Sequence, residues 1–238
     1  MGPTDARVRR NQADCTQGHV IAAMIATPTL KPTSELIPVD AATLVLVDRT
    51  RAEPRILMGR RSPNLAFMPN KFVFPGGRVD VADLAAPSAS ELKAAVFAKL
   101  QIGVGSNWHP ARARALGIAA IRETREETGV IVGQADTPPL AALQFFSRAI
   151  TPPDQPRRFD TRFFMADAAL ATHTVLAGDG ELSEIAWVTL AAMGELELPN
   201  ITRLIVADIA AVLAADADQP AGIPFYQNRH GQTHRTWL

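Results

Sequence analysis

Three glutamates lie within five consecutive residues of the segment AAIRETREETGV, residues 119–130: Glu123, Glu126 and Glu127. On a helix, residues three and four positions apart are neighbours, so these carboxylates share one side. Like charges at this spacing repel by roughly 0.2–0.5 kcal/mol per exposed pair, and by more where water is excluded. Some positive charge must therefore offset the repulsion.

Two interpretations of this helix are open. In one, Arg122 and Arg125 pair with the glutamates on a solvated face, and the acidic helix is purely structural. In the other, the carboxylates hold Mg²⁺, which takes oxygen ligands, keeps several waters and usually shares its shell with substrate phosphates. Mn²⁺ suits the same oxygen donors. One helical turn with three carboxylates would supply part of such a coordination shell.

A pair of glycines, Gly76 and Gly77, follows a short strand expected over Lys71–Phe74. Adjacent glycines at a strand end indicate a turn that needs unusual backbone angles or a close approach to a ligand. The glycine pair is therefore a second candidate for a part of a binding site.

The helix that carries the glutamates is expected over 110–128, with Pro110 in its first turn and Gly129 at its end. A second helix is expected over 89–100, because Ser88 and Glu91 form a capping-box pattern. The remaining expected elements are a helix over 201–215 and strands over 41–50, 55–62, 140–150, 161–170 and the first part of 185–193. Strands and helices do not alternate regularly. This order predicts an α/β (α+β) fold, with a mixed sheet covered by helices on both sides.

The segment RETREETGV, together with FPGGRVD upstream, resembles the Nudix hydrolase family, whose box reads G, five residues, E, seven residues and then R-E-U-x-E-E-x-G-U, where U is bulky and apolar. Residues 122–130 match the second half, with Thr124 at one apolar position. Gly77 and Asp83 match the first half, with Asp in place of Glu. Many more than seven residues separate Asp83 from Arg122. The segment 84–109 is therefore expected to be an insertion, as in the acyl-CoA diphosphatase type of this family.

The resemblance implies an α/β/α sandwich with a mixed β-sheet, and metal-dependent hydrolysis of a diphosphate bond in a nucleoside diphosphate-linked substrate. It also implies that Glu126 and Glu127 are the principal ligands of Mg²⁺ or Mn²⁺. Glu123 would be a further ligand or a partner of the base, and the carbonyl of Gly76 an extra ligand. Arg122 is expected to orient a glutamate through charge-assisted hydrogen bonds.

The general base varies within the family and can lie on the helix or on a later loop. The loop candidates are Glu181 and Glu184, in the segment GDGELSEIAWV. The competing interpretation is that both are solvent-exposed loop carboxylates.

The stretch LMGRRSPNLAFMPNKFVFPGG resembles, in part, a motif of coenzyme A-cleaving Nudix proteins. Arg61 and Ser62 stand at the motif distance before Phe74, whereas Ala66 and Asn70 replace an arginine and a glycine. Arg61 is therefore a candidate for substrate binding. Alternatively, it caps a strand at the surface, and the spacing reflects only the common fold.

A second basic segment, PRRFDTRFF, contains Arg157, Arg158 and Arg162, which could reach phosphate groups or merely balance neighbouring aspartates. The favoured substrates are coenzyme A or acyl-CoA derivatives. ADP-ribose, a nucleotide sugar or a dinucleotide are alternatives. A rival of another class is a Nudix-fold nucleotide sensor that binds without cleaving, although such proteins usually lose glutamates of the box.

The composition limits the remaining classes. The chain of 238 residues is 47% hydrophobic, which suffices for a packed core, and its 24 basic and 24 acidic residues give a formal net charge of +0. A neutral chain argues against a nucleic-acid binder that works through a broad positive field. The single cysteine, Cys15, and an early apolar run over 19–30 that is too short for a membrane span favour a cytoplasmic protein without a membrane partner.

The expected organisation is an N-terminal extension over 1–36, a Nudix hydrolase domain over 37–216 and a C-terminal tail over 217–238. The tail contains Pro and His and is expected to be irregular. The expected partner is a small-molecule diphosphate, and a homodimer is compatible with the sequence.

Overall fold

The computed structural model describes residues 36–65, 67–105, 108–173, 176–177, 179–215, 222–229 and 231–238. The chain divides into two compact units, residues 1–31 and residues 32–238, and all described residues belong to the second. The expectations for the N-terminal extension and for Cys15 lie outside the described residues, apart from Leu36.

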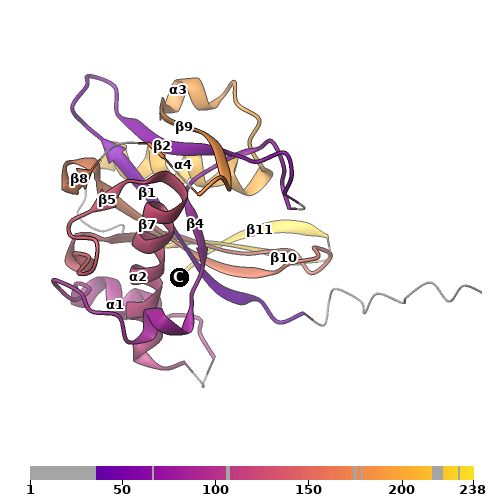
Figure 1. The fold of residues 1–238 in the computed structure, drawn as a ribbon. Helices are drawn as coiled ribbons and strands as arrows, with labels where there is room; N and C mark the ends of the chain where they lie inside the picture. Colours follow the sequence, from indigo (N-terminus) through magenta and orange to yellow (C-terminus); the bar gives the residue numbers. More distant parts are fainter. Residues whose placement is uncertain are drawn as a thin grey trace, which may run out of the picture. The chain divides into compact units, whose positions relative to one another are not determined.

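A nine-stranded mixed sheet forms the centre of the second unit (Figure 1). Its strand order is β11-β10-β6-β7-β1-β2-β3, while β4 pairs with β1 and β9 pairs with β2. The central strand β1 runs parallel to β7 and antiparallel to β2 and β4. The strands are β1 Val39–Asp48, β2 Arg55–Arg61, β3 Phe72–Val73, β4 Gly76–Arg78, β6 Gln144–Ile150, β7 Phe159–Asp167, β9 Leu182–Thr189, β10 Pro224–Arg229 and β11 Gln232–Trp237. Two further strands, β5 Ile131–Val132 and β8 Ala171–His173, pair with each other.

Helices cover both faces of the sheet (Figure 1). They are α1 Ala94–Leu100, α2 Pro110–Thr128, α3 Leu190–Met193 and α4 Asn200–Ala215, with short 3₁₀ turns at Val81–Leu84, Leu140–Ala142 and Ala168–Leu170. Among the described residues, no helix combines the length and the apolarity that a membrane crossing needs. The observed layers confirm the predicted α/β (α+β) architecture.

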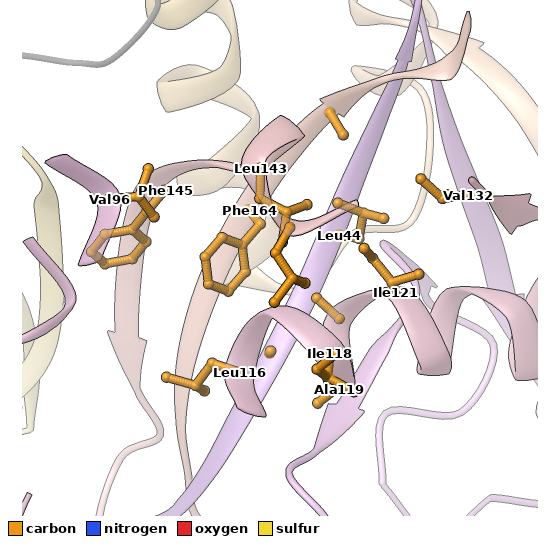
Figure 2. Packing of buried hydrophobic residues seen from close by; sticks show 14 of the residues in the cluster. Leu44, Val96, Leu116, Ile118, Ala119, Ile121, Val132, Leu143, Phe145 and Phe164 are labelled. Atoms are coloured by element: carbon orange, nitrogen blue, oxygen red, sulfur yellow. The ribbon is translucent and has the colours of Figure 1, made fainter. Parts of the chain in front are cut away.

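The core explains why β1 lies in the middle of the sheet. Its Leu44 and Leu46 point into a cluster with α1 and α2, whereas its Val45 and Val47 point into a second cluster with α4 (Figure 2). All four side chains are fully buried. Successive residues of a strand face opposite sides, so one apolar run anchors both helix layers. Each such burial contributes roughly 1.5–3 kcal/mol to stability.

Helix α2 begins and ends as predicted. Pro110 occupies its first turn, and the ring nitrogen Nδ1 of His109 accepts a hydrogen bond from the N–H of Ala111. Gly129 ends the helix with φ = 74°, in the left-handed region that favours glycine. Thr124 and Thr128 lie on the buried stripe of the helix. Their hydroxyls donate to carbonyls one turn earlier, which makes these polar residues acceptable in the core.

Two local predictions are wrong. Residues 224–237 do not form an irregular tail, because β10 and β11 pair with each other and β10 continues the sheet beside β6. Helix α1 begins at Ala94 after Lys93, so the predicted capping box does not start it.

The predicted insertion is bound to the rest of the unit by arginines of the core. The Ser88 hydroxyl donates to Glu91, and both side chains contact the guanidinium of Arg114 on α2. Further along, Arg148 of β6 donates to the carbonyls of Ile102 and Gly103 at 3.2 Å. The insertion is therefore held against α2 and the sheet at both of its ends.

The end of α2 provides a test of the fold. Gly129→Ala should lower the free energy of unfolding by about 1–2 kcal/mol, because a side chain is disfavoured in the left-handed region. Gly105→Ala is the matched control, since a Cβ there meets no atom within 4 Å and its φ is not positive. Urea unfolding of both variants would measure the difference. Equal stability of the two variants would contradict the assigned helix end.

Candidate active site

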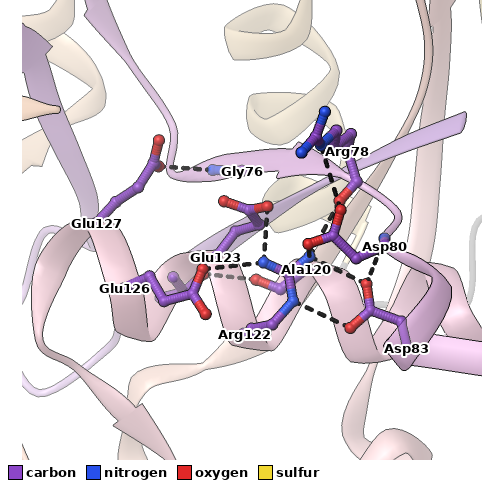
Figure 3. A network of polar contacts seen from close by, with 10 residues as sticks. Gly76, Arg78, Asp80, Asp83, Ala120, Arg122, Glu123, Glu126 and Glu127 are labelled. Carbon is purple, nitrogen blue, oxygen red and sulfur yellow. Dashed lines mark hydrogen bonds and ion pairs between the residues drawn. The ribbon is translucent and has the colours of Figure 1, made fainter. Parts of the chain in front are cut away.

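Strand β4 lies close against the end of α2 (Figure 3). The N–H of Gly76 donates to Oε2 of Glu127 at 2.9 Å. A Cβ on Gly77 would lie 2.4 Å from the carboxylate of Glu123. Neither glycine has a positive φ, and both belong to a strand paired with β1. The glycine pair therefore serves close approach, and the expected turn with unusual backbone angles is not present.

Glu127 is a buried carboxyl group without a full counter-charge. Its residue is only 3% exposed. The pKa of Glu127 is raised to about 8, chiefly by burial and in addition by the nearby charges of Glu181 and Glu123. The hydrogen bond from Gly76 and the positive charge of Arg61 act in the opposite direction without cancelling the effect. Burial also raises the pKa of Glu123, against the attraction of Arg122.

Arg122 lies between the glutamates and the start of the insertion (Figure 3). Its Nη1 donates to Glu123 at 2.8 Å and to Glu126 at 2.9 Å. Its Nε and Nη2 both donate to the buried carboxylate of Asp83 at 3.0 Å, and Nη2 also donates to the carbonyl of Arg78. These contacts are those expected of a residue that orients glutamates. Asp83 is bound to the guanidinium, so it fixes Arg122.

The two loop glutamates occupy different surroundings. Glu181 forms an ion pair with Arg61, with Nη1 and Oε1 2.8 Å apart, and its charge acts on Glu127. Glu184 lies on β9, where it pairs with Arg60 at 3.4 Å, and its side chain is 57% exposed. The structure therefore brings Glu181 toward the carboxylates of α2 and leaves Glu184 on a solvated pair.

The basic segment after β6 does not form the expected cluster of phosphate-binding arginines. Arg162 is buried and donates to Asp40 at 2.7 Å, and its burial lowers its pKa. Its guanidinium also lies over the ring of Trp108, beside the start of α2 and not its glutamate end. Arg158 donates to the carbonyls of two other residues, Leu36 and Thr151, while Arg157 is exposed. Only Arg157 keeps a free surface position.

One departure from the coenzyme A motif has a left-handed backbone. Asn70, which replaces a glycine of that motif, has φ = 60°, a conformation that asparagine tolerates. Its N–H donates to the carbonyl of Arg61 at 3.0 Å. Ala66, the other departure from the motif, lies outside the described residues.

The available donors suit a hard cation. Glu123, Glu126 and Glu127 offer only oxygen ligands, which is the chemistry that Mg²⁺ and Mn²⁺ prefer. The buried charge of Glu127 provides a physical reason for a cation there, since an isolated carboxylate is costly to desolvate. In the described part of the chain, no group of three Asp, Glu, His or Cys side chains has the arrangement of a metal site. Two of the three glutamates, Glu123 and Glu126, contact Arg122 instead.

Sequence reasoning missed the partner of Arg61. Arg61 and Glu181 meet because β2 pairs with β9, where Arg61 lies opposite Leu182. No local pattern signals a contact between residues so far apart in the chain.

The carboxyl group of Glu127 makes the stability of the cation-free protein depend on pH. Its pKa is about 8 in the folded protein against 4.5 for an ordinary glutamate, so the folded state holds the proton between these values and the unfolded state does not. The free energy of unfolding should therefore fall as the pH rises from about 5 to about 8. Glu127→Gln should remove this fall, and the variant should exceed the wild type in stability at about pH 8.5.

Urea unfolding in a chelator at both pH values measures this effect. Glu53→Gln, a substitution of an exposed glutamate in the β1–β2 connection, is the control and should keep the wild-type pH dependence. The assignment of a protonated Glu127 is wrong if Glu127→Gln shows the same fall as the wild type.

The comparisons with known proteins match this geometry. Residues 113–209 match the family model of the NUDIX domain. A Caenorhabditis elegans protein named "Putative nudix hydrolase 7" is 29% identical over 154 residues, which cover 52% of this chain and 43% of that protein. The chain thus spans less than half the length of this relative.

Two solved structures share the fold. The NUDIX hydrolase from Alicyclobacillus acidocaldarius is 24% identical with a TM-score of 0.59, covering 77% of this chain and 97% of that one. The NUDIX domain of Shewanella oneidensis NrtR, solved with ADP ribose, is 12% identical with a TM-score of 0.50, covering 78% of this chain and 94% of that one. Residues 113–209 therefore resemble a NUDIX domain, and the mixed sheet with its helices has the fold of these two Nudix structures.

Proposed function

We propose that this protein is a Nudix pyrophosphohydrolase that cleaves a diphosphate bond with the help of a divalent cation. The observation that carries the proposal is the buried carboxyl of Glu127, held by the N–H of Gly76 beside Glu123 and within the field of Glu181. A purely structural helix gives no reason to bury this group among other carboxylates. The Nudix domain match and the named relative support the same activity.

Each residue of the site has a proposed role. Glu126 and Glu127 would hold Mg²⁺ or Mn²⁺, with Glu123 and the carbonyl of Gly76 as further ligands. A bound divalent cation supplies charge neutralisation at the phosphates and a lowered pKa of a coordinated water. The hydrogen bond from Gly76 N–H fixes Glu127, and Arg122 fixes Glu123 and Glu126.

The proposed reaction is the attack of water on one phosphorus of the diphosphate. The oxygen of water forms a new bond to phosphorus, the bridging P–O bond breaks, and the leaving phosphate departs with the bridging oxygen. The proton of the water passes to a carboxylate, for which Glu181 is the better placed of the two loop candidates.

For the substrate, we favour coenzyme A or acyl-CoA derivatives. The partial motif before the glycine pair and the insertion inside the Nudix box support this choice. ADP-ribose, a nucleotide sugar or a dinucleotide are the alternatives. A Nudix-fold sensor that binds without cleaving is the rival of another class, which the retained glutamates disfavour. A cytoplasmic location also belongs to the proposal.

Incubation with Mg²⁺ or Mn²⁺ and a panel of coenzyme A, acyl-CoA, ADP-ribose, NADH and diadenosine polyphosphates tests the proposal. Wild-type protein should release phosphate monoesters from at least one of them, and a chelator should abolish the release. Glu127→Gln should lower kcat by at least about 100-fold, while Glu53→Gln should not change it. If no compound of the panel is cleaved in the presence of either divalent cation, the result favours a sensor that binds without cleaving over the proposed hydrolase.

The glycine pair provides a test that separates activity from stability. A Cβ on Gly77 meets only the flexible end of Glu123, so Gly77→Ala should displace that carboxylate, lower kcat by about 10-fold or more and leave the Tm nearly unchanged. A Cβ on Gly76 lies 2.5 Å from the backbone carbonyl of Ala42, so Gly76→Ala should lower the Tm. Full activity of Gly77→Ala would remove Glu123 from the site.

A further inference from the structure

The backbone around Glu181 is fixed on two sides. Its carbonyl accepts a hydrogen bond from the N–H of Ser62, just after β2, at 2.8 Å. Its N–H donates to the side chain of Asp179, and the N–H of Asp179 donates to the carbonyl of Glu126 on α2 at 3.1 Å. The main chain at Glu181 thus lies between the end of β2 and the end of α2. The backbone of Glu181 is fixed there, so its remaining freedom is mainly in the rotamer of the side chain.

The side chain of Arg61 determines that direction. Its Nη1 contacts Oε1 of Glu181 at 2.8 Å, and its Nε donates to the carbonyl of Phe67 at 3.0 Å. Its side chain is only 14% exposed. Hydrogen bonds from its own N–H to Lys71 and from the N–H of Asn70 to its carbonyl fix the backbone. The guanidinium is therefore held from two directions by the protein itself.

The ion pair with Arg61 keeps the carboxylate of Glu181 at the site. The main chain at Glu181 lies near the end of α2, which carries Glu126 and Glu127, and its side chain is 39% exposed. Neighbouring carboxylates repel each other, so without an attractive partner the carboxylate of Glu181 would turn toward water. Arg61 supplies that attractive contact. A guanidinium suits the task because it stays charged and holds a carboxylate in a fixed orientation.

We propose that Arg61 is a positioning residue, which holds the carboxylate of Glu181 beside the glutamates of α2 and acts on the reaction through Glu181. This inference rests on the proposed hydrolase function. It replaces the expectation that Arg61 binds the substrate. The arginine and its spacing before the glycine pair then serve catalysis whichever diphosphate is cleaved.

The neighbouring residue provides a matched control. Arg60 also pairs with a glutamate of β9, Glu184, but the distance is 3.4 Å and both side chains are substantially exposed. The Arg60 side chain is 40% exposed and that of Arg61 is 14% exposed, so the two arginines have different surroundings. Arg60→Ala removes a neighbouring arginine–glutamate pair that lies at the surface.

The experiment measures kcat and KM with coenzyme A, dephospho-coenzyme A and ADP-ribose in the presence of Mn²⁺. The variants are Arg61→Ala, Arg61→Lys, Glu181→Gln, the double variant Arg61→Ala/Glu181→Gln and Arg60→Ala. We expect Arg61→Ala to lower kcat by about 10- to 100-fold with KM changed by less than about twofold. Arg61→Lys should recover part of kcat, and Arg60→Ala should match the wild type.

The double variant decides between the two roles of Arg61. If Arg61 acts through Glu181, the double variant should be no slower than Glu181→Gln alone. Losses that multiply, or an Arg61→Ala variant whose KM rises for coenzyme A more than for dephospho-coenzyme A while kcat is kept, would overturn the proposal and make Arg61 a substrate ligand. An unchanged kcat of Glu181→Gln would overturn it as well. Failure of the hydrolase function itself would look different, because the wild type would then cleave no substrate.

Discussion

The site depends on one steric and electrostatic constraint: the carboxylates at the end of α2 lie against strand β4 with no side chain between them. Gly77 permits this approach, because its Cβ would overlap the carboxylate of Glu123, whereas Gly76 permits the close pairing of β4 with β1. The same closeness removes water from Glu127, which raises its pKa and leaves its charge in need of a partner. Several features of the fold maintain the approach, including the pairing of β4 with β1 and the end of α2 at Gly129.

The repulsion among the three glutamates is offset in two different ways, and the two interpretations of the acidic helix are therefore not exclusive. Arg122 reaches Glu123 and Glu126 with one nitrogen of its guanidinium and uses the other two for Asp83. Among the residues that the structure describes, Glu127 receives a backbone N–H and the more distant charge of Arg61, and it has no hydrogen bond from Arg122. Arg122 thus orients the carboxylates of Glu123 and Glu126. The buried carboxyl of Glu127 has no such partner, so a bound cation would stabilise its ionised form. The anchoring of Asp83 also explains how an insertion can follow it, since the chain leaves the box from a fixed point and returns at the start of α2.

Sequence reasoning located the parts whose signals are local. The limits of α2, its glycine end and the first two strands all follow from periodicity, capping and turn residues. The hairpin of β10 and β11 was missed, because β11 is polar and exposed and shows no apolar alternation. Ser88 and Glu91 form their hydrogen bond, but Arg114 recruits both to dock the insertion and the helix begins later. The burial of Arg162 and the pairing of Arg61 with Glu181 arise from strand pairing between distant segments, which no local pattern encodes.

The contacts of Arg61 also change what the coenzyme A motif can say about the substrate. Arg61 binds Glu181 and the carbonyl of Phe67, so the contacts of this arginine are explained within the protein. Of the motif, only the residues other than Arg61 then bear on the proposed substrate. Side chains that the protein leaves accessible near the glycine pair are further candidates for contacts with the groups attached to the proposed diphosphate. Arg78 is one such residue, since its side chain is 71% exposed next to the glycine pair and pairs only with the half-exposed Asp80 among the described residues. The exposed surface beyond β4 therefore complements the motif as a place to look for the specificity of the proposed hydrolase.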